Sequence, residues 1–261
     1  MANVIYEPKG KAREYSPLAL NIYLECTHGC EYCYAPRCMQ RKRESYFKKP
    51  EPRKNIIENL KSQLEREAPK KQVLLSFIGD PYCETEDNNR ATRECLELLL
   101  EHRVPVAILT KGGERCLKDL DLFKKFGEHI MIGATLTFDN FKDSSKWEPG
   151  AASPGERLEV LKKLHQNGIK TFASFEPVVI PAQSLSLMKQ GLDAIDVYKV
   201  GKLNNYKGLD KEIDWKDFLV KTLDLLRGAE KDFYIKHDLR TACAGVKLYG
   251  NEVLPDEHSV L

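Results

Sequence analysis

Two periodicities alternate along the chain. Short apolar runs rich in β-branched residues are separated by longer segments in which apolar side chains recur at helical spacing. The short runs predict strands at 18–24, 72–78, 104–110, 130–138, 169–175 and 193–200. About six such strand–helix units predict an α/β protein with a parallel sheet, because right-handed crossovers curl them into a full barrel, a partial barrel or an open doubly wound sheet.

The helical segments carry clear internal signals. Segments 54–67 and 88–103 each place their apolar residues on one face, which predicts two amphipathic helices. The run Ser153-Pro154-Gly155-Glu156 forms a capping box with proline at the first helical position. It predicts a helix from this point to Gly168, whose residue type suits a helix end.

The length of 261 residues fits one large domain, since single cores stop growing near about 250–300 residues. We expect a barrel domain over 18–230 with an N-terminal extension, 1–17, and a C-terminal extension, 231–261. The segment DFYIKH, 232–237, is a possible seventh strand.

Net charge and hydropathy indicate no membrane partner, and any basic surface for nucleic acid must be local. Forty-one Lys and Arg against thirty-nine Asp and Glu leave a formal charge of +2, so no global field favours nucleic acid or membrane. The first residues lack the apolar core of a signal peptide, and no run approaches the roughly 18 apolar residues of a membrane span. We therefore expect a cytoplasmic protein with no membrane partner. In that reducing compartment, eight cysteines indicate metal ligation or chemistry rather than disulfides.

The stretch ECTHGCEYCYAPRC, 25–38, follows the first predicted strand. Thiolates at Cys26, Cys30 and Cys33 can wrap a soft metal centre, with a glycine between them that lets the backbone fold back. A [4Fe–4S] cluster normally takes four thiolates, so three would leave one iron open. The alternatives are a zinc site completed by Cys38 or His28, and a loop of unliganded thiols. We interpret Cys38 as a bystander and His28 as a loop residue.

Polar residues also gather where the predicted strands end. In a parallel barrel these ends meet at one mouth, where reactive groups lie. Alternation along the strands puts certain residues on a common face. Either these residues form a shared ligand pocket, or they merely cap the strands. They are Lys111, Gly133, Thr135, Thr137, Ser174, Glu176 and Lys199.

The cysteine spacing, with Tyr32 and Tyr34 flanking the last cysteine, resembles the radical S-adenosylmethionine (SAM) superfamily. The run GCEYCYA is similar to its spore photoproduct lyase-like branch. The resemblance continues in the same order through GDPY at 79–82, ILTKGGERCLKDLDLF at 108–123 and the segment 147–181. It therefore covers about residues 18–181.

This resemblance implies a partial (β/α)6 TIM-type barrel with a [4Fe–4S] cluster on Cys26, Cys30 and Cys33. The amino and carboxylate groups of SAM would bind the open iron. One electron, delivered by a reductant protein of the flavodoxin or ferredoxin type, would cleave SAM to methionine and a 5′-deoxyadenosyl radical that abstracts a substrate hydrogen. The protein would supply placement and exclude water. The implied class is a lyase or modification enzyme.

The resemblance also assigns residues to the cofactor. It implies that the backbone of Tyr32 contacts the adenine and that Gly79 and Asp80 lie at the methionine amino group. Lys111 would bind the methionine carboxylate, and a buried lysine does need a charged partner. The alternative for Lys111 is a structural ion pair with Asp80 or Glu176.

Three further residues are candidates on the same ground. Thr135 and Thr137 would hydrogen-bond the ribose or the carboxylate, or they satisfy only backbone groups. Glu176, followed by Pro177, would line the adenosyl side.

One departure bears on the reaction. The spore lyase quenches its product radical with a cysteine just ahead of the aspartate, and this chain has LLSFIGD, 74–80, with no cysteine there. Reversal of a thymine dimer by that route is therefore in doubt. Cys83 follows the Asp80-Pro81 turn, where a thiol would act as hydrogen donor or thiyl radical. The alternative is a buried structural cysteine.

A basic segment with interleaved aromatic residues follows the cluster, at 37–55. Cations and aromatics together bind phosphates and stack bases, which predicts a DNA, RNA or nucleotide substrate that is repaired or modified. A solvated charged loop, a small phosphorylated metabolite and a peptide are the alternatives, and a non-catalytic iron–sulfur or zinc module on nucleic acid is an alternative of another class. The candidate contacts are Arg41, Lys42, Arg43, Lys48 and Lys49.

Overall fold

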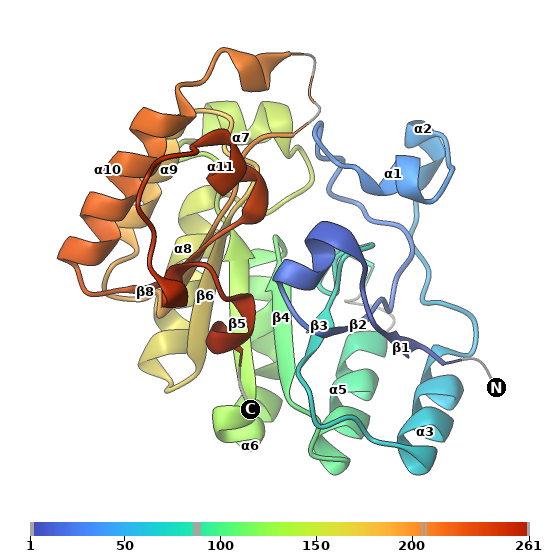
Figure 1. Ribbon diagram of the computed structural model, residues 1–261. Coiled ribbons are helices and arrows are strands. Elements are labelled where there is room, and N and C mark those ends of the chain that lie inside the picture. The colour runs from blue at the N-terminus through green and yellow to red at the C-terminus, as the bar shows by residue number, and fades with distance from the viewer. Residues whose placement is uncertain (1–2, 86–89, 205, 207, 260–261) are drawn as a thin grey trace.

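The computed structural model describes residues 3–85, 90–204, 206 and 208–259, and it is built on one eight-stranded sheet (Figure 1). The strands lie in chain order from β1 to β8. β1 is antiparallel to β2, and each later neighbouring pair is parallel. The strands are β1 Ile5–Tyr6, β2 Leu18–Leu20, β3 Val73–Leu75, β4 Val106–Thr110, β5 Ile130–Thr135, β6 Lys170–Phe175, β7 Val197–Val200 and β8 Asp232–Ile235.

The sheet is a partial barrel, as predicted. β1 and β8 are its edges in the pairing order, so the barrel is not closed by strand pairing within the described residues. Each of the six predicted runs contains one strand, although 18–24 contributes only its first three residues. The run at 232–237 contributes β8, which pairs with β7. The parallel part therefore has seven strands, one more than the six predicted.

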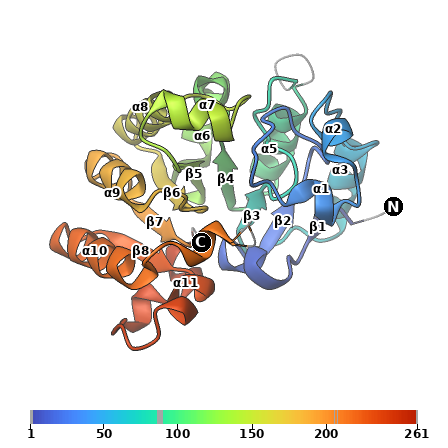
Figure 2. The same ribbon diagram turned by 90° about the horizontal axis from the view of Figure 1, so that it is seen from above.

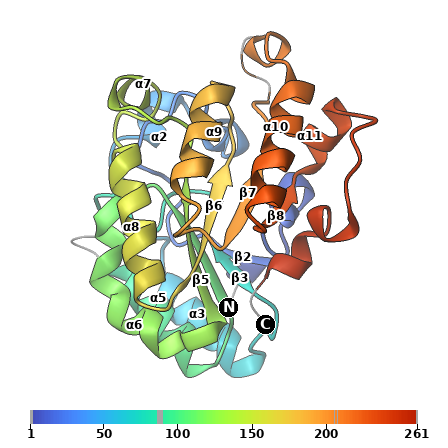
Figure 3. The ribbon, with the colours of Figure 1, turned by 90° about the vertical axis from the view of Figure 1, so that its left-hand side faces the viewer.

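Helices surround the curved sheet on its outer side, as the view from above shows (Figure 2). In the C-terminal half, α8, α9 and α10 lie side by side over the later strands (Figure 3). The α-helices are α1 Ala35–Cys38, α2 Arg43–Tyr46, α3 Ile56–Arg66, α5 Ala91–Glu101, α6 Leu120–Phe126, α7 Phe141–Trp147, α8 Pro154–Gln166, α9 Pro181–Gln190, α10 Trp215–Gly228 and α11 His237–Ala242. The 3-10 helices are η1 Gly10–Glu14, η2 Gly113–Asp119, η3 Gly127–His129, η4 Leu209–Lys211, η5 Gly250–Glu252 and η6 Pro255–His258.

The predicted helix signals are observed. Segments 54–67 and 88–103 contain α3 and α5, whose buried faces pack in one core cluster with β2, β3 and β4. At the start of α8, Ser153 Oγ accepts a hydrogen bond of 3.2 Å from the backbone N–H of Glu156. Gly168 adopts a φ of +76° just beyond the helix end, a conformation that glycine reaches without steric cost.

The inside of the partial barrel is filled by a small apolar layer. One inward residue comes from each of the strands β3 to β7: Leu74, Ala107, Met131, Phe172 and Val197. Gly133 makes room for the largest of them, because a Cβ there would lie 2.5 Å from the ring of Phe172. The lumen is therefore packed, and functional groups must lie above this floor at the carboxyl ends of the strands.

The N-terminal segment 10–16 crosses the open side of the sheet to the far edge. Glu14 Oε1 accepts hydrogen bonds of 2.7 Å from the Tyr234 hydroxyl and from the backbone N–H of His237. The carbonyl of Tyr15 accepts one of 3.0 Å from Lys199 Nζ. Lys11 forms an ion pair with Asp238. Side-chain and backbone contacts thus connect the segment to the strand ends of β7 and β8, where strand pairing does not.

No helix in the described part of the chain combines the length and the apolar character needed to cross a bilayer.

Candidate functional site

The cysteine loop, residues 26–34, lies between β2 and α1. Figure 1 and Figure 3 show it and the helices that follow at the same end of the molecule as α7. Cys26 and Cys30 are buried and Cys33 is partly buried, whereas Cys38 is exposed at the end of α1. Gly29 has a φ of +63°, and Cys33 N–H donates to the Cys30 carbonyl over 3.0 Å, so the loop folds back on itself.

Arg43 supports this loop from α2. Its guanidinium donates to the carbonyls of Gly29 and Cys30 over 2.8 and 2.7 Å. It also lies 4.8 Å from the ring centre of Phe47. The sequence interpretation grouped Arg43 with the candidate nucleic-acid contacts, and the structure gives it this structural role in addition.

Burial raises the pKa of all three loop thiols, to about 12 for Cys30. In the free protein they are therefore protonated thiols, and a soft cationic centre would have to displace their protons to be bound. Among the described residues, no three or more His, Cys, Asp or Glu side chains are arranged to hold a single ion. Three thiols on one folded-back loop form a soft donor set.

His28 is buried inside the same loop. Its Nδ1 lies 3.5 Å from Asp80 Oδ2, and its Nε2 is a buried atom with no hydrogen-bond partner among the described residues. Burial lowers the pKa of His28 to about 4, so the imidazole is neutral. The unpartnered nitrogen marks the loop interior as a place where a polar group is still to be satisfied.

Gly79 and Asp80 join the cysteine loop to the ends of β3 and β4. Gly79 has a φ of +71°, and a Cβ there would lie 2.6 Å from the Glu25 carbonyl oxygen. Asp80 Oδ1 accepts hydrogen bonds from Thr110 Oγ1 and from Tyr82 N–H over 2.6 and 2.8 Å. Its Oδ2 accepts from the backbone N–H of Lys111 over 2.7 Å. The Asp80 carboxylate thus already has a structural role at the predicted cofactor position.

Lys111 directs its charge toward the cysteine loop. Its Nζ lies 5.6 Å from the ring centre of Tyr32. No carboxylate of the described residues forms an ion pair with this Nζ, so the predicted structural alternative, a pair with Asp80 or Glu176, is not observed among them. A partly buried cation at a barrel mouth, held beside the thiols, is suited to an anionic ligand.

Thr135 and Thr137 lie deep at the end of β5, both nearly inaccessible to solvent. The carbonyl of Thr135 accepts a hydrogen bond of 2.7 Å from the Arg157 guanidinium. The Thr137 hydroxyl donates one of 3.4 Å to Glu148 Oε1. Sequence reasoning missed Glu148 and Arg157. The only available signal was their position in the segment 147–181 that carries the resemblance.

Glu176 belongs to a separate polar cluster on β6 to β8. Its carboxylate forms an ion pair with Lys236 and accepts a hydrogen bond of 3.1 Å from the Tyr15 hydroxyl. The same hydroxyl shares a hydrogen bond of 2.6 Å with Ser174 Oγ. Lys236 lies 3.8 Å from Glu14 as well. Ser174 and Glu176 share a face, as the strand alternation predicted.

Cys83 is completely buried in the core between the sheet and α5. Its backbone N–H donates to the Asp80 carbonyl over 3.2 Å. This position favours the structural alternative for Cys83 over the predicted hydrogen donor. Cys95, Cys116 and Cys243 are buried as well.

The basic segment runs past α1 and α2 at the surface. Arg41 pairs with Glu25, while Lys42 and Lys48 are exposed and Lys49 is 82% exposed at 3.8 Å from Glu51. The lysines therefore present their charges to solvent, and the two arginines are engaged near the cysteine loop.

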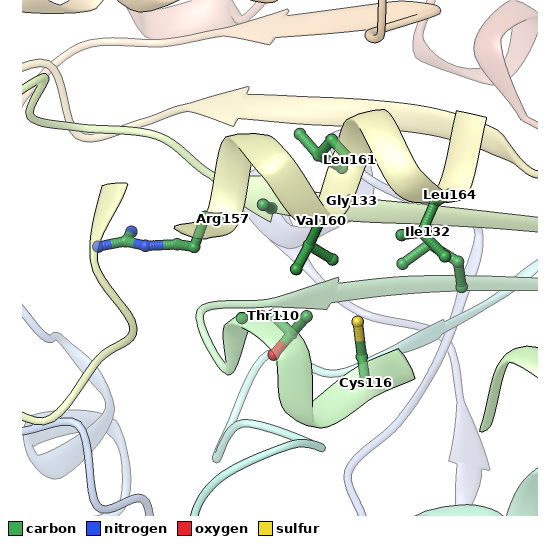
Figure 4. Close-up of a pocket in the computed structure, with 10 residues that line it drawn as sticks. Thr110, Cys116, Ile132, Gly133, Arg157, Val160, Leu161 and Leu164 are labelled. Atoms are coloured by element: carbon green, nitrogen blue, oxygen red, sulfur yellow. The ribbon is translucent and has the colours of Figure 1, made fainter. Parts of the chain in front are cut away.

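A small cavity lies away from the mouth, between β4, β5, η2 and α8 (Figure 4). Its lining is mostly apolar, including Ile132, Val160 and Leu164. Arg157 extends from the first turn of α8 away from these residues (Figure 4). The cavity is a packing gap behind the sheet and not part of the candidate site.

A family model described as Radical SAM superfamily matches residues 20–192. An uncharacterized protein of Methanocaldococcus jannaschii is 34% identical over 167 residues, which are 61% of this chain and 60% of that protein. A Radical SAM Nalpha-GlyT isomerase of Pseudomonas phage M6 is 25% identical over 154 residues, which are 59% of this chain and 31% of that protein. The chain therefore spans less than two thirds of the length of these curated relatives.

Solved structures with the same fold include Streptococcus suis SuiB bound to S-adenosylmethionine, with a TM-score of 0.63 and 16% identity over 88% of this chain and 53% of that one. Spore photoproduct lyase complexed with dinucleoside spore photoproduct has a TM-score of 0.60 and 15% identity, covering 78% of this chain and 62% of that chain. At these identities the likeness concerns the fold.

Proposed function

Because the chain belongs to the radical SAM superfamily, whose members use a [4Fe–4S] cluster and SAM, we propose that Cys26, Cys30 and Cys33 hold such a cluster and that the protein cleaves SAM. When bound, the cluster supplies the electron that splits SAM into methionine and a 5′-deoxyadenosyl radical. The remaining work belongs to the chain itself, which must bind the cofactor, orient it and exclude water.

The observation that carries this proposal is the placement of Lys111 beside the cysteine loop. Its Nζ lies near the Tyr32 ring without an ion-pair partner among the described residues. It is therefore available to bind the carboxylate of SAM. Gly79 and Asp80 shape the adjoining backbone and would lie at the amino group, with the backbone of Tyr32 at the adenine.

The other predicted contacts take more specific parts. Thr135 and Thr137 line the end of β5, where Thr137 is already directed by Glu148 and has lone pairs left to accept from a ribose hydroxyl. Glu176 would face the adenosyl side. Its charge is balanced by Lys236, so it would act there as a hydrogen-bond acceptor and not as an unpaired anion.

For the substrate we propose a nucleic acid or nucleotide, as a lyase or modification enzyme would take. Lys42, Lys48 and Lys49 present positive charge beside the cysteine loop, which is suited to phosphates. The dinucleoside bound by spore photoproduct lyase, a protein of similar fold, supports this class. The electron would come from a reductant protein of the flavodoxin or ferredoxin type.

The test of the reaction is anaerobic reconstitution with iron and sulfide, followed by reduction with dithionite in the presence of SAM. We expect about four irons per chain and release of 5′-deoxyadenosine. Cys30→Ala is the control and should lose both. A cluster-loaded protein that binds SAM and releases no 5′-deoxyadenosine would support the alternative of a non-catalytic module.

The test of the substrate class uses the triple variant Lys42→Ala, Lys48→Ala and Lys49→Ala, which spares the two engaged arginines. We expect its affinity for labelled oligonucleotides to fall about tenfold or more at low salt, with a smaller salt dependence, because phosphate contacts release counterions. The matched control replaces Lys70, Lys71 and Lys124, which are exposed and belong to the opposite end of the sheet. Equal loss in both triple variants, or none in either, would contradict a nucleic-acid site on this segment.

A further inference from the structure

A charged pair is buried next to the cysteine loop. Glu148 and Arg157 are each 1% exposed and form an ion pair. Burying two charges is costly, and a buried pair often contributes no more to stability than apolar residues of the same volume would. A role other than stability is therefore worth seeking for this pair.

Arg157 is held on three sides before it meets Glu148. Its Nε donates to the Ala152 carbonyl over 2.9 Å, and its two terminal nitrogens donate to the Thr135 carbonyl over 2.7 Å and to Ser144 Oγ over 3.3 Å. These partners come from the end of β5, from α7 and from the turn that precedes α8. The guanidinium therefore fixes the Glu148 carboxylate relative to the sheet.

Glu148 reaches the cysteine loop through Tyr32. Its Oε1 accepts a hydrogen bond from the Tyr32 hydroxyl, although the two residues are 116 positions apart. This carboxylate stays charged, because Arg157 and Lys111 hold the pKa of Glu148 below its ordinary value despite the opposing effect of burial. A charged acceptor forms the stronger kind of hydrogen bond.

The segment 147–152 around Glu148 also docks on the loop through its backbone. Glu31 N–H donates to the Trp147 carbonyl over 2.8 Å, and Gly150 N–H donates to the His28 carbonyl over 2.9 Å. A Cβ at Gly150 would lie 2.4 Å from the Thr27 carbonyl oxygen, so only glycine allows this approach. These contacts involve the loop backbone on either side of Cys30 and leave the thiol groups uninvolved.

The segment 147–152 also contacts Lys111, the other residue proposed to bind SAM. Ala152 N–H donates to the Lys111 carbonyl over 3.0 Å, and the Lys111 Nζ lies over the Tyr32 ring. Tyr32 and Lys111, which the proposed function places at opposite ends of SAM, are thus both fixed by one short turn and its charged pair.

We propose that Glu148 and Arg157 are positioning residues that hold Tyr32, and through it the loop carrying Cys30 and Cys33, in the orientation that SAM binding requires. The inference rests on the proposed function, since it concerns the same cofactor. It adds that the orientation of Tyr32 comes from its side-chain hydroxyl and a distant carboxylate as well as from its own loop.

The experiment compares Tyr32→Phe, Glu148→Gln and the double variant by the Kd for SAM of the cluster-loaded, unreduced protein. If Glu148 acts through the Tyr32 hydroxyl, each single change should raise the Kd about tenfold. The double variant should be no more than about twofold weaker than the worse single, because both changes act on one hydrogen bond: Phe removes the donor, and Gln removes the charge of the acceptor. Additive losses near hundredfold, or an unchanged Kd in Tyr32→Phe, would overturn the proposal.

Two controls separate positioning from folding. Tyr34→Phe makes the same change on the other side of Cys33, where the hydroxyl bonds the Phe77 carbonyl over 3.1 Å, and it should shift the Kd less than about twofold. If Glu148→Gln fails to fold, Arg157→Lys takes its place in the experiment. This change keeps the positive charge and loses the forked hydrogen bonds, so its Kd for SAM should lie between those of the wild type and Tyr32→Phe. A Kd for Arg157→Lys equal to that of the wild type would count against the pair.

Spectra add a readout that does not depend on turnover. The electron paramagnetic resonance signal of the reduced wild-type cluster should change when SAM binds, and in Tyr32→Phe the change should require about tenfold more SAM at the same iron content. A wild-type protein that binds no SAM would refute the proposed function. Wild type and variants that bind SAM equally would refute only the positioning role.

Discussion

The two sides of the barrel mouth are built on different principles. On the cysteine-loop side, His28 Nε2 has no hydrogen-bond partner and the Lys111 ammonium has no ion-pair partner among the residues that the structure describes. On the β6–β8 side, Glu176, Lys236 and Glu14 balance one another around Tyr15. Unsatisfied buried groups are costly and are retained where a ligand satisfies them. This contrast supports our proposal that the first side is the binding site, while the second connects the N-terminal segment to β6–β8.

The strongest test of this contrast removes one member of the balanced side. Lys236→Met leaves the carboxylate of Glu176, which is 19% exposed, without its ion-pair partner, and we expect the free energy of unfolding to fall by about 1–3 kcal/mol. Urea unfolding of the cluster-free protein measures this loss. The additional change Glu176→Gln should restore part of the stability, and a double variant with fully additive loss would show that the two residues do not act as a pair.

Gly79→Ala tests the close backbone contact between the turn after β3 and the segment that leads into the cysteine loop. The added methyl group meets the backbone of Tyr23 and Glu25 at 2.7 and 2.6 Å, and a positive φ adds strain of about 1–3 kcal/mol. We expect a folded protein whose iron content after reconstitution falls by more than half. Gly155→Ala is the control, because a Cβ there meets nothing within 4 Å. Full iron loading of Gly79→Ala would show that the loop does not need this close approach.

Lys111→Met should behave in the opposite way to Lys236→Met. The Lys111 ammonium forms no ion pair within the described residues and acts on Glu148 only through its charge, while Arg157 pairs with that carboxylate directly, so stability should fall by less than about 1 kcal/mol. Loss of a charged hydrogen bond to SAM, worth about 1.5–3 kcal/mol, should raise the Kd roughly 10–100-fold. Equilibrium dialysis of the cluster-loaded protein measures this, and an unchanged Kd would remove Lys111 from the cofactor site.

The smallest effect concerns pH. The pKa of Glu148 is lowered in the folded protein, so its contribution to stability is present above the ordinary carboxyl pKa and is lost as pH falls through the lowered value. The stability difference between wild type and Glu148→Gln should therefore stay nearly constant from pH 7 to about pH 5 and shrink below that. Urea unfolding of the cluster-free proteins across this range checks the sign, and a difference that grows on acidification would contradict it.

Much of the fold follows from local pattern. The alternation of apolar runs and amphipathic segments located all six predicted strands and the helices α3, α5 and α8, because each signal is contained in fewer than about twenty residues. The spacing of the three cysteines could also be read from the sequence, because it lies within one loop, and their role as ligands stays a prediction. What the pattern missed is long-range. Only the folded protein brings together the hydrogen-bonded pairs Tyr15–Ser174 and Tyr32–Glu148, because the partners are far apart in the sequence.

The same distinction explains the charged residues. Arg43 and Lys42 are neighbours of identical sign, yet one supports the Gly29 and Cys30 carbonyls and the other is exposed. Charge count within a segment cannot separate them, because the difference lies in which way each side chain leaves the backbone. Arg157 likewise lies in a helix start rich in polar residues and is nevertheless buried.

The layer formed by Leu74, Ala107, Met131, Phe172 and Val197 has a kinetic consequence. Since it blocks the route through the sheet, any molecule bound above it enters and departs by the same door. If SAM and a substrate both bind there, as we propose, the one bound second would cover the first, so a competition experiment should show that excess substrate slows the release of bound SAM.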